Sequence, residues 1–407
     1  MNIICLLFLL VSFTPFALIY GVLGMYSNSH NWRKYFICII SVVFVVAYNY
    51  NPVGHPDLTR YFVQIETAKQ YDFMQYNNWM GDSLFVKNLF FWAVGKLQMP
   101  KLVPAITTTI VYGCSFYITC DFAEREGLIN IIFETIVLQF CLLPFVFIVN
   151  NVRNVAAFAL ISLAVYRDLV QKKKNIVTLL LYILPCFLHK TGFVAILIRV
   201  LSLYIGRYLF VLLFVAAMLP TIVRYLFKYY LFFAKFGPVG ILISKSILTA
   251  YRATISTSDW AITSMNSRVS ITTKYIDYII CVLLIVIVLL LNKESNLKSR
   301  NYLNYVKSVA VITIATNIFR TPVYWRFFAL AIISAGPAIL IATAKAFSKE
   351  KYFRIIYLLL IAFAMAFFGI NIYGSRVNID YIDLVTSFML NPFVFIIAKF
   401  FYNIILI

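Results

Sequence analysis

Apolar runs recur from one end of the chain to the other, and short polar stretches separate them. Most runs are roughly 15 to 22 residues long, and a transmembrane helix needs about 20. We therefore predict an all-α polytopic integral membrane protein with about 12 to 13 transmembrane helices. The predicted apolar helices are residues 3–23, 35–50, 102–120, 128–149, 155–171, 175–188, 192–206, 208–223, 276–292, 303–319, 323–343, 355–372 and 386–404.

Two neighbouring segments, 175–188 and 192–206, are shorter than a full crossing requires. His189 and Lys190 lie between them. Backbone that is irregular at membrane depth has to be buried in protein or to line a water-filled cavity. The pattern predicts a hairpin of short or broken helices beside such a cavity.

Two long polar regions interrupt the apolar runs, at about 51–101 and 224–275. Within the first, residues 84–98 are apolar but short and carry lysines, which favours an interfacial helix over a membrane span. The acidic cluster at 121–126 predicts a loop between two spans.

Composition supports a membrane protein, since 63% of the residues are hydrophobic, 12% are charged and the mean hydropathy is +0.89. No polar stretch is long enough for a separate soluble domain, so we predict one membrane domain over 1–407. Residues 1–23 lack a basic start and a convincing cleavage site, which favours a retained helix over a signal peptide.

The formal net charge is +20. It reflects either the positive-inside bias of a multi-pass protein or a basic cavity for an anionic lipid or sugar. The basic residues are dispersed between spans, which argues against a nucleic-acid partner. Placing the loops with Arg33, Lys172 and Lys298 inside puts both long polar regions on the outer side. Basic residues divide almost equally between the two sides, so this orientation depends on their concentration in short inner loops.

Arg153 and His189 lie at membrane depth, where charged and titratable groups are costly. Each also has a purely structural interpretation. Arg153 could be an interfacial anchor, and His189 could bond a neighbouring carbonyl. Asp57, which follows a proline, could simply initiate a turn, but it shares a predicted helical face with Arg60 and Tyr61.

Three motifs together resemble one family. Asp57-Leu-Thr-Arg60-Tyr61 resembles the D-x-x-x-Y region of EpsG-like, Wzy-type bacterial polysaccharide polymerases. Asn151 to Ala157 resembles the R-x-x-x-A helix start of that family, and Phe187 to Gly192 resembles its F-H-x-S/T motif. The chain departs from the family at Asn154, where glutamine is usual, and at Thr191, in place of serine.

The resemblance implies a GT-C-like membrane glycosyltransferase that joins undecaprenyl-diphosphate-linked oligosaccharide repeat units for capsule, exopolysaccharide or O-antigen. It places the active site on the outer face of the bacterial cytoplasmic membrane. It implies no cofactor and no metal, and it suggests a flippase and a chain-length regulator as further partners besides the lipid bilayer.

The resemblance also suggests roles for individual residues. Asp57 and His189 would be catalytic, as the base for the acceptor hydroxyl or, for His189, as a hydrogen-bond partner of the leaving phosphate. The remaining candidates are expected to bind the diphosphate (Arg153, Arg320 and Arg326) or to bind or orient sugars (Arg60, Tyr61 and Arg268).

Two functions from other classes stay open. A lipid-linked oligosaccharide flippase or an anion transporter would also have broken helices and intramembrane charges. A membrane acyltransferase that modifies glycans is a weaker alternative. The chain contains no HExxH, Walker or Gly-x-Ser-x-Gly motif, so metallopeptidase, NTPase and serine hydrolase functions lack support.

Overall fold

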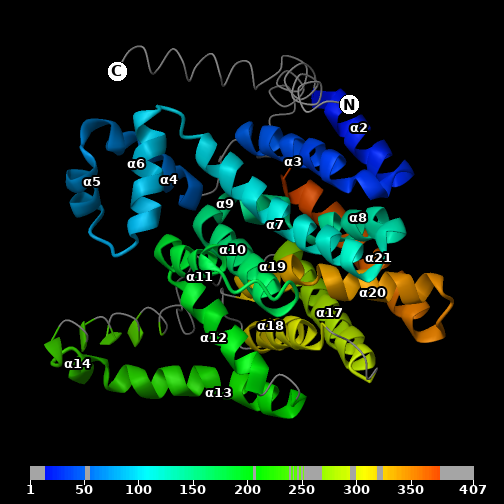
Figure 1. Cartoon of the computed structure of the whole chain (residues 1–407). Helices are drawn as coiled ribbons and strands as arrows, with labels where there is room; N and C mark the ends of the chain where they lie inside the picture. The colour runs from blue at the N-terminus through cyan, green and yellow to red at the C-terminus, as the bar shows by residue number, and fades with distance from the viewer. Residues whose placement is uncertain are drawn as a thin grey trace. The chain divides into compact units, whose positions relative to one another are not determined.

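In the computed structural model every regular element of the described residues is a helix (Figure 1). The described residues are 14–50, 56–204, 208–237, 240–241, 243–244, 247–248, 251, 268–293, 299–318 and 324–375. The prediction of an all-α protein is confirmed for this part of the chain. The predicted span at 386–404 lies outside it.

The chain divides into two compact units. The first unit comprises residues 1–197 and 332–407, and the second comprises 198–331. The single membrane domain over 1–407 stays a prediction.

The first unit contains most of the helices. They are α2 (Thr14–Ser27), α3 (Trp32–Tyr48), α4 (Pro56–Thr67), α5 (Phe73–Met80), α6 (Phe85–Lys96), α7 (Leu102–Glu126), α8 (Ile132–Leu142), α9 (Phe145–Asn150), α10 (Val152–Leu169), α11 (Ile176–Leu188), the first part of α12 (Thr191–Tyr204), α20 (Gly336–Phe347) and α21 (Lys351–Ser375). The second unit contains α13 (Leu209–Lys228), α14 (Tyr230–Phe233), α17 (Arg268–Leu291), α18 (Arg300–Ile318) and most of α19 (Tyr324–Ser334).

Four of the described helical segments are long and apolar enough to cross a membrane. They are Ser29–Tyr48, Leu102–Glu126, Thr273–Leu291 and Lys351–Asn371. A helix pair bent by 57°, Trp325–Ser334 with Gly336–Phe347, would be a fifth. The protein is therefore a helical membrane protein.

Two predicted boundaries on the first unit's long helices are wrong. The acidic cluster at 121–126 is not a loop, because α7 continues through it to Glu126. Asp121 stays in the helix because Arg125 donates to its carboxylate at 2.6 Å and the Tyr166 hydroxyl donates at 2.7 Å. Because two donors satisfy this buried carboxylate, Asp121 can be accommodated inside the helix.

The predicted span at 128–149 is broken rather than continuous. Helix α8 ends at Leu142, Leu143 is extended, and a new helix begins after Pro144. Proline disfavours the helical conformation of the residue before it, which accounts for this break. A second break at Asn151 starts α10, so Arg153 lies in the first turn of a new helix.

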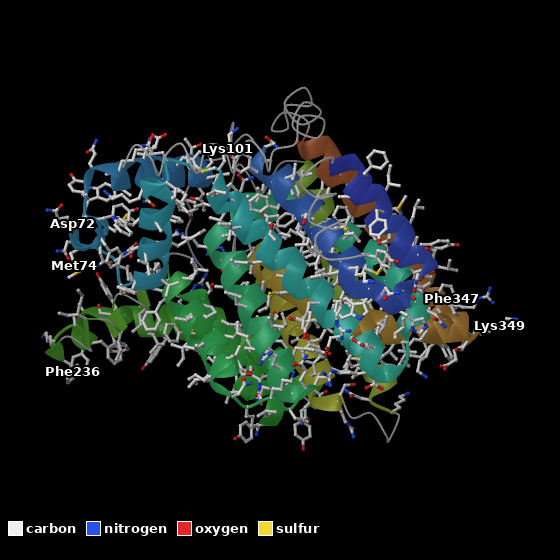
Figure 2. The ribbon with its side chains drawn as sticks, turned by 45° about the horizontal axis from the view of Figure 1, so that its top comes forward. Asp72, Met74, Lys101, Phe236, Phe347 and Lys349 are labelled. Atoms are coloured by element: carbon white, nitrogen blue, oxygen red, sulfur yellow. The ribbon has the colours of Figure 1, made fainter. Side chains whose placement is uncertain are left out.

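The predicted break between two short helices is confirmed, and their arrangement as a hairpin stays a prediction. Helix α11 ends at Leu188, α12 begins at Thr191, and His189 has an extended backbone between them. Helix α6 matches the helix expected at 84–98, and its place at the membrane interface stays a prediction. Helix α5 begins at a capping box formed by Asp72 and Gln75. Asp72 and Met74, at the start of this helix, lie at the left edge of the view in Figure 2.

The predicted span at 323–343 is also broken, at Ala335. Buried side chains of α7 and α8 satisfy the carbonyl groups that the break exposes. The Gln139 amide donates to the carbonyl of Ile332 at 3.1 Å and to the Ser115 hydroxyl at 2.6 Å. The Thr119 hydroxyl donates to the Gln139 side-chain oxygen at 2.8 Å. Without these partners the freed carbonyls would be costly in an apolar interior.

We expect Gly336→Ala to destabilise the protein by about 1–3 kcal/mol, because it overpacks this polar network. A Cβ atom at Gly336 would approach the Thr119 hydroxyl oxygen to 1.9 Å. Gly113→Ala is the matched control, since no described atom outside the neighbouring residues and backbone of α7 lies within 4 Å of its would-be Cβ. Thermal unfolding in detergent should show a lower midpoint for the first variant only, and equal midpoints would contradict the close packing.

Candidate functional site

Helix α4 positions the first group of candidate residues. Leu58, Tyr61 and Ile65 are buried and recur at helical spacing, so they form the face that packs inward. Asp57 and Arg60 lie off this face and form an ion pair of 2.9 Å, with both side chains more than half exposed. The expected common face of Asp57, Arg60 and Tyr61 is therefore only partly realised, because Tyr61 alone of the three is buried.

Arg153 contacts Tyr61 in two ways. Its Nη2 donates to the Tyr61 hydroxyl at 2.8 Å, and its guanidinium carbon lies 4.5 Å from the centre of the Tyr61 ring. The Nε of Arg153 is buried and has no hydrogen-bond partner. Among the described residues Arg153 also has no carboxylate partner. This cation is held in place by an aromatic ring instead of by a countercharge.

Lys87, on α6, is the most deeply buried cation near this site. Its side chain is 1% exposed and forms an ion pair with Asp82. Asp82 also accepts hydrogen bonds from the backbone N–H of Leu84 at 3.0 Å and from the Asn88 amide at 3.1 Å.

Burial shifts the pKa values of this pair. Burial lowers the pKa of Lys87, Asp82 opposes that shift, and the charges of Arg153 and Arg60 lower the pKa further. Burial by itself would raise the pKa of Asp82, but the hydrogen bond and charge of Lys87 outweigh it, so the Asp82 pKa lies below its usual value. Each partner of the ion pair therefore stabilises the charged form of the other against the effect of burial.

Three cations consequently share one small region of the first unit. Arg60 and Lys87 each have a carboxylate partner, and Arg153 has none in the part of the chain that the structure describes. Three positive and two negative charges of these residues leave a net charge of +1. The guanidinium of Arg60 also lies 5.4 Å from the Tyr61 ring centre. The amino end of α10 adds positive potential beside Arg153, because the dipole of a helix is positive at that end. The region is suited to binding an anion.

His189 joins the site through the first turn of α10. Its Nδ1 lies 2.8 Å from the Thr191 hydroxyl, and that hydroxyl donates to the side-chain oxygen of Asn154, the residue after Arg153. With the hydroxyl proton directed at Asn154, Nδ1–H donates to Thr191 and Nε2 is the basic nitrogen. The backbone N–H of Thr191, 3.2 Å from Nδ1, favours the opposite tautomer, in which Nε2 donates. In the first tautomer Nε2 can act as a base, and in the second tautomer Nε2 can donate a hydrogen bond.

Apolar packing holds these helices together. Leu188, the residue before His189, forms a buried cluster with Ala156 and Ala157 of α10, and Val86 of α6 packs against this cluster. Helices α10 and α11 lie side by side, and α6 contacts both α4 and α11 (Figure 1). The backbone positions of Lys87, Arg153 and His189 are therefore fixed by one shared cluster of apolar side chains.

The structure brings some predicted site residues together and not others. Asp57, Arg60, Tyr61 and Arg153 form connected contacts, and His189 is linked to Asn154. The remaining candidates belong to the second unit or lie outside the described residues. Arg326 lies on α19, Arg268 begins α17, and Arg320 is outside the described part of the chain.

Sequence reasoning missed the Lys87–Asp82 pair and treated Lys87 only as a sign of an interfacial helix. A signal was available, because Lys87, Phe91 and Val94 recur at helical spacing and share the buried face of α6. A lysine on the apolar face of an amphipathic helix predicts a buried cation with a partner.

No family model, no curated protein and no solved structure matches this chain. The class of this protein is therefore assigned from its own residues and their geometry. It is a helical membrane protein with a partly buried basic site.

Proposed function

We propose that this protein is a polymerase that joins undecaprenyl-diphosphate-linked oligosaccharide repeat units in capsule, exopolysaccharide or O-antigen synthesis. The proposal places a GT-C-like membrane domain of about 12 to 13 spans in the bacterial cytoplasmic membrane, with both long polar regions and the active site on the outer face. Flippase and chain-length-regulating proteins would be its partners.

The proposal rests mainly on the contacts of the Arg153 guanidinium. A guanidinium with a buried, unpartnered Nε and no carboxylate partner among the described residues presents donors suited to an anion. The planar fork of arginine matches two phosphate oxygens at once. Because Arg60 and Lys87 supply further N–H donors in the same region, a diphosphate, with its several acceptor oxygens, suits the site better than a single carboxylate does.

The proposed reaction is one displacement at the anomeric carbon of the donor glycan. The acceptor sugar hydroxyl forms the new bond, and the bond from the anomeric carbon to the diphosphate oxygen breaks with its electron pair remaining on the diphosphate. The hydroxyl proton goes to His189 or Asp57, and the cations stabilise the leaving diphosphate. The diphosphate is itself a leaving group, so the reaction uses no cofactor, and a single displacement inverts the anomeric centre.

The other candidate residues have secondary roles in this proposal. Arg320 and Arg326 would bind the diphosphate of a second lipid carrier, and Arg268, together with Arg60 and Tyr61, would bind or orient the sugars. Holding both carriers at once would convert the encounter of two lipids into a reaction between neighbouring groups.

The function is tested by reconstituting the purified protein in vesicles with a fluorescent lipid-linked repeat unit. We expect a ladder of products whose lengths increase by one repeat unit, with release of the undecaprenyl diphosphate carrier. Movement of the labelled lipid between leaflets without any ladder would instead identify a flippase. Transfer of an acyl group to the repeat unit would identify an acyltransferase.

A further inference from the structure

Lys87 is a buried cation for which the proposed function has no specific role. Its side chain is 1% exposed, and its ammonium group has three donors, of which one direction is taken by Asp82. Burying a lysine is costly, and an ion pair made only for stability can often be replaced by apolar residues without loss. The position of this lysine therefore calls for a further explanation.

The position of Lys87 follows from contacts on both sides of it. Val86, the residue before it, packs against the buried cluster formed by Ala156, Ala157 and Leu188. Phe91, one turn later on α6, packs against Tyr61 with ring centres 5.6 Å apart. Tyr61 is the residue that holds Arg153. Lys87 thus lies on the turn of α6 that precedes the Tyr61 contact, near enough to Arg153 for the two charges to interact.

Two further donors, in the first turn of α10, are buried and have no hydrogen-bond partner among the described residues. They are Nε of Arg153 and the side-chain nitrogen of Asn154, whose side chain is 4% exposed. Native proteins leave few buried donors unpaired, and those that remain need an explanation. Two such donors on neighbouring residues, one of which carries a charge that interacts with Lys87, suit one ligand with several acceptor oxygens.

We propose that Lys87 is a second phosphate ligand and that it remains paired with Asp82 until a diphosphate binds. This inference rests on the proposed function for the identity of the lipid, but the ligand chemistry it requires is simply a diphosphate. On binding, an ammonium N–H turns from the Asp82 carboxylate to a phosphate oxygen, while Arg153 and Asn154 bind the other oxygens. Asp82 remains stabilised, because it is 32% exposed and keeps its bonds from Leu84 and Asn88.

The inference predicts that Lys87→Met weakens diphosphate binding by about tenfold, the value of one charge-assisted hydrogen bond. Binding would be measured on the full-length protein in detergent with two probes, inorganic pyrophosphate and farnesyl diphosphate. Tighter binding of farnesyl diphosphate would identify a lipid-borne diphosphate as the ligand, and equal binding would indicate the free ion. Lys96→Met is the matched control, because it removes the same charge from the same helix at a partly exposed position.

A double variant, Lys87→Met with Asp82→Asn, separates ligand binding from a structural role. If the ion pair only stabilises the fold, removing both charges should restore binding, since no unpaired charge remains. If Lys87 binds phosphate, the double variant should bind as weakly as Lys87→Met while unfolding at nearly the wild-type temperature. Wild-type affinity in either variant, or no binding of either probe to the wild-type protein, would overturn the inference.

The binding assay does not depend on polymerisation. Lys87-dependent diphosphate binding by a protein that forms no product ladder would refute the polymerase and leave the phosphate ligand in place. A ladder formed equally well by Lys87→Met and by the wild-type protein, with unchanged affinity for both probes, would refute the role of Lys87 and leave the polymerase in place.

Discussion

Arg153→Lys is expected to lower the rate of polymerisation by at least about 100-fold while the protein still folds into the membrane. The substitution keeps the positive charge but loses the planar fork, so it removes one of two parallel bonds to the diphosphate and the stacking on Tyr61. A charge-assisted hydrogen bond contributes about 1.5–3 kcal/mol, and a change of about 2.7 kcal/mol at the transition state corresponds to 100-fold in rate. The product ladder in the reconstituted assay measures the effect.

Arg167→Lys is the matched control for this substitution. Arg167 lies on the last turn of the same helix, and its contacts are to Thr178 at 3.2 Å and to Asn175 at 3.3 Å. We expect nearly unchanged product lengths from the control. Long-chain product from Arg153→Lys at the wild-type rate would reduce Arg153 to an interfacial anchor and remove the observation on which the proposed function rests.

His189→Ala is expected to lower kcat by about 100-fold or more with little change in KM, because proton transfer by a positioned side chain contributes about 10²–10⁴ in rate. Arg153 and the other cations would still bind the lipid carrier, so the loss should fall on the chemical step. Initial rates of polymer formation at several concentrations of repeat unit separate the two constants.

The contacts of Thr191 supply the companion variants. Thr191→Val keeps the shape of the side chain but removes the hydroxyl that joins His189 to Asn154, so we expect a smaller fall in kcat, of about tenfold. Thr191→Ser keeps the hydroxyl and should retain most of the activity. If His189→Ala polymerises normally, or if Thr191→Val and Thr191→Ser behave alike, His189 does not act through this arrangement.

Hydropathy determined the helical membrane class because apolar surface of this extent has to be removed from water, whichever helices pack together. It also predicted the break at His189, since 175–188 and 192–206 are each too short for a full crossing. Local sequence patterns predicted helix ends less reliably where tertiary contacts stabilise polar side chains inside a helix. Helix α7 continues past Asp121 because Arg125, one turn away, and the distant Tyr166 and Gln171 satisfy the carboxylate. Sequence spacing shows the first of these partners but not the other two.

The cost of a charge at membrane depth singled out Arg153 and His189 from the sequence, because that cost depends on residue type and position along the chain. Only the tertiary structure showed that Tyr61 holds Arg153, that Asn154 and Thr191 connect to His189, and that Lys87 is buried beside them. These contacts join α4, α6, α10 and the α11–α12 turn. Which helices meet depends on how their apolar faces fit together, and the pattern along any one helix leaves that choice open.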